Sequence, residues 1–313
     1  MNPYPLSAVL LLSSSLAMTA AMAETLKVEM TAKEVDIAID NAGTTQRMWT
    51  FGGTIPGPMV RVKQGDVVDF TLHNHPDNSN SHSMDFHAAR VDVLDEFVEV
   101  KPGDSKQFTF SADYPGVFIY HCGASAMSEH ISRGMYGVII VDPKEGYSEN
   151  YPRPDREYVL VQGDLFKAET SPDDITLGQG WQASLINGKI FHYDPVHDPN
   201  ASLALEAEPG ERVRLFFVNA MINEAAAMHP IAGIWDRVWD NGNPQNIRHG
   251  LQTVEVAPAH GMVMDIVPPA GRASNNAIVD HRMKHALNGA ITVLMAYEGA
   301  DPQKGRSNQL ILR

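Results

Sequence analysis

The amino-acid sequence predicts an all-β protein built from two tandem Greek-key β-sandwiches. Short runs rich in Val, Ile, Phe and Tyr recur along the chain between turn signals, and part of this pattern occurs twice. The 313 residues are ample for two domains of about 130–150 residues each. The 24 Gly and 20 Pro residues suit a turn-rich β protein better than a helical one.

The predicted strands follow one another along the whole chain. Alternation of apolar and polar residues is typical of a strand with one buried face, and a short apolar run is typical of a strand buried on both faces. These patterns predict strands over Thr25–Ile39, Met59–Leu72, Lys106–Ser111, Gly116–Cys122, Tyr136–Val141, Glu157–Gln162, Leu203–Asn219, Thr253–Val267 and Ile291–Tyr297. Turn signals at Gln64–Asp66, Pro102–Asp104 and Pro209–Glu211 interrupt or separate them.

An internal repeat indicates that the second half copies the first. The matching pairs are Val60–Asn74 with Leu205–Asn219, Gly134–Val141 with Asn288–Val293, and Ile119–Cys122 with Val279–Arg282. In this alignment Arg282 stands opposite Cys122 and Leu287 stands opposite Met135. We therefore expect a thiolate metal site in the first copy alone.

The domain boundaries also follow from the sequence. Residues 1–23 have the features of a signal peptide, with an apolar run and the small-x-small site Ala21–Ala23 before Glu24. We expect a periplasmic or secreted protein after its removal, without a membrane span, because the apolar run is too short. The first domain is expected at residues 24–143, a linker at 144–156, and the second domain with a C-terminal tail at 157–313.

Charge and cysteine content narrow the classes of function. The chain has 24 basic and 38 acidic residues and a formal charge of −14, which disfavours nucleic acid as a partner. The one cysteine, Cys122, excludes an internal disulfide. In an exported chain this leaves metal ligation or an inert buried thiol.

Cys122 belongs to a group of four potential copper ligands. His130 and Met135 follow it with the spacing C-x7-H-x4-M, and His82 lies upstream. One thiolate, two imidazoles and a weak axial thioether suit copper in electron transfer, whereas zinc has no need of the methionine. Each residue type is common alone in a protein core, but their combination in one loop favours a blue-copper site.

A second metal centre is predicted beside the first. Neighbouring side chains on a strand point to opposite faces, so His121 faces away from the site of Cys122. His87 is expected on the same side as His121. Within the strand-like run that ends at His87, Asp85 shares the face of His87. The repeat sets His281 opposite His121 and makes it the third ligand, unless it is a relic of the duplication. Three imidazoles would leave one coordination position open for catalysis.

These residues resemble those of the copper-containing nitrite reductases. The resemblance rests on the runs His82–Ala89, Gly116–Cys122, His130–Gly137, Met228–Gly233 and Val279–His281, and it covers essentially all of the mature chain. It implies two cupredoxin-like domains, two coppers per chain and a homotrimer with active sites between subunits.

The resemblance also implies a role for each matched residue. The implied roles are type 1 copper ligands for His82, Cys122, His130 and Met135; type 2 copper ligands for His87, His121 and, from a neighbouring subunit, His281; proton donors for Asp85 and His229; and a substrate-pocket wall for Ile231. The implied activity is dissimilatory-type, one-electron reduction of nitrite to nitric oxide, with electrons passing from type 1 to type 2 copper.

The implied electron donor is a small cupredoxin or c-type cytochrome. The loop between Cys122 and His130 is one residue shorter than in well-known members, and it lacks their Pro-Trp before the histidine. Both departures lie where a donor would dock, so they bear on donor identity and on the colour of the site.

Three other functions are weighed against nitrite reduction. A two-domain multicopper oxidase needs a histidine-rich trinuclear cluster, but the sequence has the single His-x-His pair His73–His75, and Gly123 follows Cys122. An electron carrier without catalysis is disfavoured because Asp85, His87, His229 and His281 are all present. Conversion of another small nitrogen species, such as hydroxylamine, stays open.

Overall fold

The computed structural model describes residues 23–201 and 203–305. The predicted signal peptide therefore lies outside the described residues apart from Ala23, as does the end of the predicted C-terminal tail. In the described part, no helix has the length and apolar character needed to cross a membrane.

Strands dominate the described residues. The first half contains β1 (Thr25–Ala38), β2 (Thr45–Phe51), β3 (Val60–Lys63), β4 (Val67–Asn74), β5 (Asp85–Phe86), β6 (Ser105–Ser111), β7 (Gly116–His121) and β8 (Tyr136–Asp142), with helices α1 (Val93–Glu96) and α2 (Met127–Ser132). The second half contains β9 (Arg156–Phe166), β10 (Trp181–Ile186), β11 (Leu205–Ala207), β12 (Val213–Asn219), β13 (Ala226–Pro230), β14 (Trp235–Asp240), β15 (Ile247–Leu251), β16 (Val254–Val256), β17 (Gly261–Ile266), β18 (Ser274–Asp280) and β19 (Ile291–Ala296), with helices α3 (Pro172–Thr176) and α4 (Met283–Ala286).

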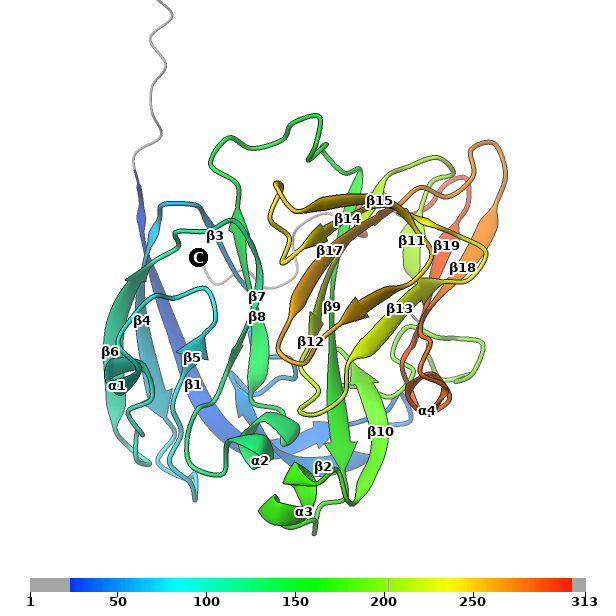
Figure 1. Cartoon of the computed structure of the whole chain (residues 1–313). Coiled ribbons are helices and arrows are strands. Elements are labelled where there is room, and N and C mark those ends of the chain that lie inside the picture. The colour runs from blue at the N-terminus through cyan, green and yellow to red at the C-terminus, as the bar shows by residue number, and fades with distance from the viewer. Residues whose placement is uncertain (1–22, 202, 306–313) are drawn as a thin grey trace, which may run out of the picture.

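Each half forms a β-sandwich, which confirms the predicted fold class (Figure 1). In the first sandwich, β1 to β8, the sheet β2-β1-β4-β6 packs on the sheet β3-β8-β7-β5. In the second sandwich, β9 to β19, the sheet β10-β9-β12-β17-β14-β15 packs on β11-β19-β18-β13-β16. No strand or helix occurs in residues 143–155, and the boundaries 24–143, 144–156 and 157–313 stay predictions.

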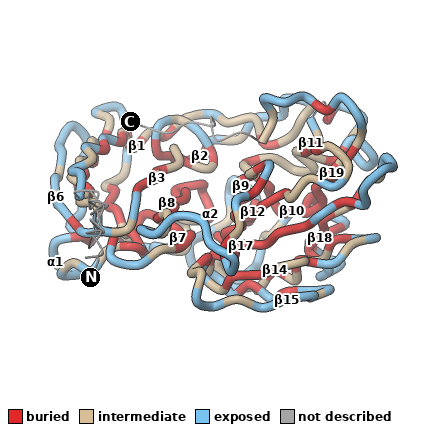
Figure 2. The backbone as a smooth tube through the Cα atoms, turned by 90° about the horizontal axis from the view of Figure 1, so that it is seen from above, coloured by how far each residue is buried: buried red, intermediate tan, exposed pale blue. Residues whose placement is uncertain are grey.

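The two sandwiches pack against each other through β7 and β8. Val117 and Ile119 of β7 belong to one apolar cluster with Val218 of β12 and Val263 of β17. Figure 2 shows the buried backbone of β7 and β8 close to that of β12 and β17. Because β7 is covered on both faces, the metal-ligand candidates at its end lie deep in the molecule.

Alternation along β7 separates the two candidate sites. Tyr120 and Cys122 belong to the core of the first sandwich, whereas Ile119 belongs to the cluster between the sandwiches. His121 follows Ile119 by two residues and so shares its face. The structure therefore has the alternation that the sequence predicts for His121 and Cys122.

The strands differ from the prediction in two ways. The predicted strands Met59–Leu72, Leu203–Asn219 and Thr253–Val267 are each split in two. In the first two, Gly65 and Gly210 adopt φ values of +98° and +87° that end the extended chain. The predicted strands also do not include β2, β10, β13, β14, β15 or β18. For β15 the reason is its exposure, since a strand without a buried face has no apolar alternation to detect.

Candidate metal centres

The first candidate site, which we call the thiolate cluster, consists of His82, Cys122, His130 and Met135. The Sγ atom of Cys122 lies 3.2 Å from Nδ1 of His130, and the Nδ1 atoms of His82 and His130 are 3.3 Å apart. All four side chains are buried, and a backbone hydrogen bond of 3.0 Å joins Cys122 to Met135. Two loops of one sandwich thus bring together the four residues that the sequence singles out.

The protonation of the thiolate cluster suits a metal ion. Burial raises the pKa of the Cys122 thiol to about 11. Burial, followed by the proximity of His82, lowers the pKa of His130 to about 4. At neutral pH the metal-free cluster therefore holds a thiol and a neutral imidazole, and a cation would favour loss of the thiol proton. A sulfur anion with two imidazoles and a nearby thioether fits copper.

Backbone groups and a tryptophan hold the thiolate cluster in shape. The N–H of Ser83 donates to Sγ of Cys122 at 3.3 Å. Gly134 makes the turn between His130 and Met135 with a φ of +111°, which glycine adopts without strain. The ring of Trp49 lies edge-on to His130, with ring centroids 4.7 Å apart. Ser83 and Trp49 have no recognisable signal in the sequence, because both act through contacts between distant segments.

The second candidate site, the imidazole cluster, consists of Asp85, His87 and His121. The Nε2 atoms of the two histidines are 3.0 Å apart, and Oδ2 of Asp85 lies 3.5 Å from His121 Nε2 and 3.7 Å from His87 Nε2. The pairing of β5 with β7 sets Asp85 directly opposite His121. Burial, followed by His121, lowers the pKa of His87, so its imidazole is neutral and able to bind a metal.

The position of His121 Nδ1 also suits metal binding. Its Nδ1 lies 3.0 Å from the carbonyl oxygen of Cys122. A proton on Nδ1 donated to this carbonyl leaves Nε2 with a free lone pair that points at the imidazole cluster. Within the described residues, the potential ligand atoms converge in two groups of three. One is His82, Cys122 and His130 of the thiolate cluster, and the other is the whole imidazole cluster.

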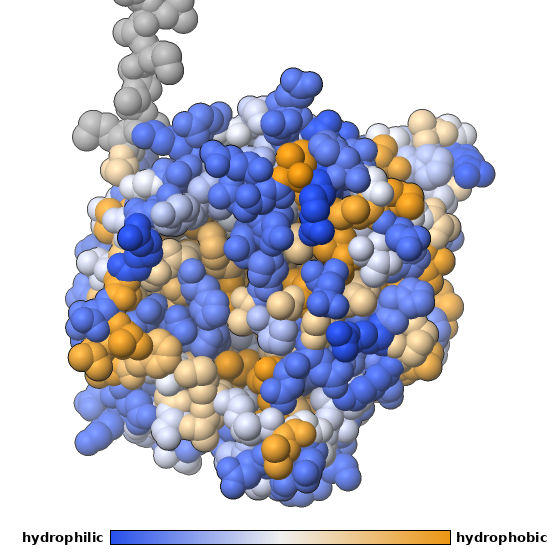
Figure 3. Space-filling model, viewed as in Figure 1, coloured by the Kyte–Doolittle hydropathy of each residue, from blue (hydrophilic) through white to orange (hydrophobic). Residues whose placement is uncertain are grey.

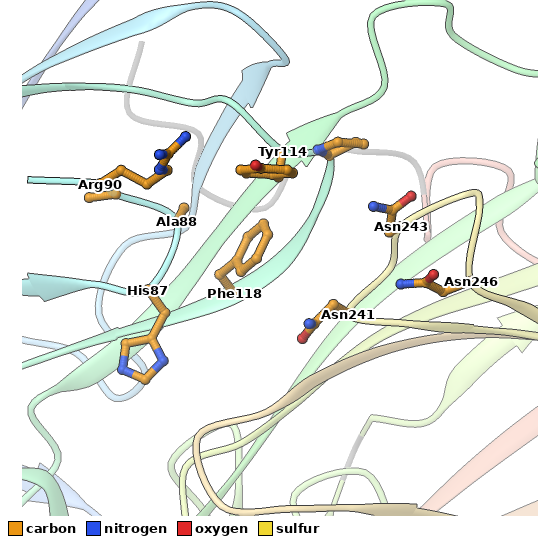
Figure 4. A pocket seen from close by; sticks show the side chains of 10 residues that line it. His87, Ala88, Arg90, Tyr114, Phe118, Asn241, Asn243 and Asn246 are labelled. Carbon is orange, nitrogen blue, oxygen red and sulfur yellow. The ribbon is translucent and has the colours of Figure 1, made fainter.

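A cavity of about 220 Å³ borders the imidazole cluster at His87 (Figure 4). Arg90 and Tyr114 of the first sandwich line it, and Asn241, Asn243 and Asn246 line it from the turn between β14 and β15. In Figure 4 the three asparagines face Arg90 across the cavity. The cavity, which both polar and apolar side chains line, lies at His87, whereas the residues of the thiolate cluster are buried.

The other predicted site residues lie in the second sandwich. The rings of His229 and His281 lie edge to face with centroids 5.4 Å apart. His229 Nδ1 lies 2.6 Å from the carbonyl oxygen of Gln252, and Ile231 is exposed just after β13. Within the chain, His281 is in neither of the converging ligand groups. The roles given to these three residues stay predictions.

The structure corrects the alignment of the repeat at the metal ligands. His121 pairs with Tyr136 just after Met135, and Val279 pairs with Ile291 just after Ala290. Val279 therefore corresponds to His121, and Asp280 corresponds to Cys122. His281 is not the counterpart of His121, so the repeat gives no reason to make it a ligand.

Equivalent hydrogen bonds support the corrected alignment. The N–H of Ala227 donates to Oδ1 of Asp280 at 2.8 Å, as the N–H of Ser83 donates to Cys122. Gly289, with a φ of +124°, takes the place of Gly134. His285 then corresponds to His130, and its Nδ1 lies 2.5 Å from Oδ2 of Asp280. A buried Asp–His pair thus occupies the corner of the second sandwich that holds the thiolate cluster in the first.

The fold and the two donor clusters define a class: a two-domain copper protein of the cupredoxin type. A family model described as multicopper oxidase matches residues 32–146. A crystal structure of a multicopper oxidase aligns with a TM-score of 0.74 at 21% identity, over 87% of this chain and 89% of that one, which shows the shared fold alone.

More similar proteins define the family. The copper-containing nitrite reductase of Neisseria meningitidis is 32% identical over 284 residues, covering 88% of this chain and 70% of the relative. The structure of copper nitrite reductase from Nitrosomonas europaea aligns with a TM-score of 0.88 at 50% identity, over 92% of this chain and 100% of that one. The Cu-containing nitrite reductase of Thermus scotoductus aligns with a TM-score of 0.78 at 31% identity, over 90% and 63%. The chain belongs to the copper-containing nitrite reductases.

Proposed function

We propose that the chain binds type 1 copper in the thiolate cluster and type 2 copper at the imidazole cluster, and reduces nitrite to nitric oxide. The overall reaction is NO2⁻ + e⁻ + 2H⁺ → NO + H2O. Bound copper supplies one-electron chemistry and, at the imidazole cluster, a Lewis-acidic position for nitrite. The observation that carries the proposal is that His121 and Cys122, neighbours in sequence, belong one to each cluster. A short covalent path therefore joins the two centres.

The residues of the two clusters divide the work. The buried thiolate cluster excludes water and fixes its ligands, which suits electron transfer without substrate. In the imidazole cluster, the carboxylate of Asp85 lies within 3.7 Å of Nε2 of both histidines. Its carboxyl is thus near enough to hydrogen-bond a nitrite oxygen and to pass it a proton.

His229 is proposed as the source of the second proton. If its Nδ1–H donates to the carbonyl oxygen of Gln252, Nε2 is the atom left to take up and release a proton. His229 and His281 are neighbours on the same face of the second sandwich. A partner subunit that supplies His281 to the imidazole cluster would therefore bring its His229 to the same site, opposite Asp85.

Three further features belong to the proposal. The chain forms a homotrimer in which the partner's His281 completes the type 2 site and Ile231 lines the substrate pocket. A small cupredoxin or c-type cytochrome delivers the electron. The location is periplasmic or secreted, on the strength of the signal-like sequence of residues 1–23.

Nitric oxide release tests the function. Copper-loaded protein with a reduced donor and nitrite, without oxygen, is expected to form NO, and Asp85→Asn is expected to lower kcat on the order of 100-fold while keeping the blue absorption. Asp113→Asn is the matched control, because Asp113 is an exposed carboxylate that pairs with Arg90 beside the same cavity. Absence of NO from the copper-loaded wild type would refute nitrite reduction.

A further inference from the structure

Glu34 is a buried carboxylate that neither cluster includes. The core-facing residues of β1 before it are Val28, Met30 and Ala32, and Glu34 continues this row with 8% of its surface exposed. Burying a carboxylate in an apolar row costs free energy unless polar partners compensate. A residue that breaks the alternation of its own strand in this way marks a functional or strained position.

The partners of Glu34 come from the loop that leads to His82. Its Oε1 accepts hydrogen bonds from the backbone N–H groups of Ser79 and Asn80 at 3.0 and 2.9 Å, and from Nδ2 of Asn80 at 3.0 Å. The same oxygen lies 3.4 Å from Nε2 of His82. One carboxylate oxygen therefore touches both the loop and the ring that the loop carries.

The unsatisfied end of His82 points at this oxygen. Nδ1 of His82 faces the thiolate cluster, and Nε2 is buried without a well-aligned hydrogen-bond partner among the described residues. When Nδ1 binds a metal, the ring proton must sit on Nε2. A buried N–H needs an acceptor, and Glu34 Oε1 offers one after a small rotation of either side chain.

We propose that Glu34 is a positioning residue of the thiolate cluster, which holds Nε2 of His82 and whose negative charge lowers the reduction potential of the copper bound there. The inference rests on the proposed function, since it requires copper at Nδ1 of His82. A negative charge this close stabilises the more positive oxidised ion over the reduced one.

The corresponding carboxylate of the second sandwich shows which contacts of Glu34 are purely structural. Ala32 pairs with Asn74, and Gln162 pairs with the corresponding Asn219, so Asp164 occupies the strand position of Glu34. Asp164 also anchors the following loop, by accepting the N–H of Ile222 at 3.0 Å.

The position of His82, however, is occupied by alanine in the second sandwich. The corrected alignment sets Ala226 opposite His82, so the second carboxylate has no ligand to hold. Anchoring of a loop is therefore common to both carboxylates. Contact with a ligand histidine belongs to Glu34, whose side chain is one methylene longer.

The test compares two carboxylate-to-amide variants. Glu34→Gln keeps an oxygen for the loop but removes the charge. We expect the copper-loaded variant to stay blue, with the ratio of reduced to oxidised type 1 copper at a fixed potential raised on the order of tenfold, equivalent to about 59 mV for one electron. Asp164→Asn, the matched control, is expected to leave this ratio unchanged. Spectroelectrochemical titration of the blue band measures both.

The outcomes distinguish failure of the role proposed for Glu34 from failure of the proposed type 1 copper site. A blue wild type with an unshifted Glu34→Gln, or an equal shift in Asp164→Asn, overturns the role of Glu34 alone. A copper-loaded wild type without blue absorption overturns the type 1 site and this inference with it. If Glu34→Gln does not fold, Glu34→Asp replaces it. The shorter aspartate can still anchor its loop, as Asp164 does in the second sandwich, but it moves the negative charge away from His82. Its potential is expected to rise less, and an unchanged potential overturns the inference.

Discussion

In the first sandwich the turn after β7 brings Cys122 within 3.2 Å of His130, whereas in the second the turn after β18 brings Asp280 within 2.5 Å of His285. The backbone frame is the same, including a left-handed glycine and an N–H donated to the thiol or carboxylate. The side chains decide what the corner does.

The two corners differ in how they treat buried charge. Burial raises the pKa of Cys122, so this corner requires a cation to hold a thiolate. Burial alone would raise the pKa of Asp280 too, but hydrogen bonds from His285 and from backbone N–H groups outweigh it, and the pKa is lowered. Because hydrogen bonds already stabilise the Asp280 carboxylate, this corner needs no metal ion to hold a negative charge. The comparison teaches that the same backbone corner holds a metal site where its buried acidic side chain lacks enough hydrogen bonds to stabilise its charged form.

The largest expected effect comes from removing the thiol. Cys122→Ala should abolish the blue absorption completely and reduce donor-driven NO formation to background, because electrons lose their entry point. Asp280→Asn, at the corresponding position, should leave the blue absorption intact. Visible spectra of the copper-loaded variants measure this, and a blue Cys122→Ala protein would place the thiolate site elsewhere.

The second effect is on stability. Asp280→Ala removes the buried carboxylate at Nδ1 of His285, and we expect the free energy of unfolding of the copper-free protein to fall by roughly 3–5 kcal/mol. Denaturant unfolding measures this loss. A change below about 1 kcal/mol would show that the Asp–His pair does not stabilise the second corner.

The paired glycines give a smaller effect. A Cβ at Gly134 would meet the end of the Ile55 side chain, which can move, whereas a Cβ at Gly289 would meet the backbone oxygen of Ser184, which cannot. Both variants also strain a positive φ. We expect Gly289→Ala to cost roughly 3 kcal/mol and Gly134→Ala roughly 1–2 kcal/mol, with a shifted blue band in the latter alone. The reverse order of stability in denaturant unfolding would contradict this account.

The smallest effect concerns two carboxyls whose pKa values are shifted in opposite directions. Burial raises the pKa of Glu96 to about 7, whereas the hydrogen bond from Lys284 lowers the pKa of Glu224. The folded protein keeps the Glu96 proton to higher pH than the unfolded chain. The stability contributed by Glu96 is therefore full below its ordinary carboxyl pKa and is lost as pH rises toward about 7. The contribution of Glu224 has the opposite sign and is lost as pH falls below the ordinary carboxyl range.

Unfolding midpoints of the copper-free protein from pH 4 to 8, a window of about four pH units around these pKa values, measure both contributions. The difference between wild type and Glu96→Gln should fall as pH rises from the ordinary carboxyl pKa toward about 7 and should level off above that. The difference between wild type and Glu224→Gln should fall only at its acidic end. A pH-independent difference for Glu96→Gln would contradict the raised pKa.

Sequence reasoning predicts the thiolate cluster because three of its members lie within the short run Cys122–Met135. It cannot align the repeat there, since a shift of two residues preserves the alternation of a strand and keeps every side chain on the same face. Only the ladder between β18 and β19 fixes Asp280 as the counterpart of Cys122.

Contacts between distant segments account for the rest of what the sequence does not reveal. Glu34 on β1 meets His82, which follows β4, and the sole signal for Glu34 in the sequence is its charge at a core-facing position of β1. The exposed faces of His229 and His281 belong, in the proposal, to a contact between subunits that one chain cannot display. The fold and family are predicted correctly because they rest on local periodicity and contiguous motifs.

The copper content per chain tests the central claim most directly, namely that the first sandwich holds one thiolate site beside one imidazole site and the second corner holds none. Elemental analysis of the fully loaded, assembled protein should give two coppers per wild-type chain and one for Cys122→Ala. One copper per wild-type chain would contradict the paired centres, and four would indicate the trinuclear cluster of a multicopper oxidase in place of the single type 2 site.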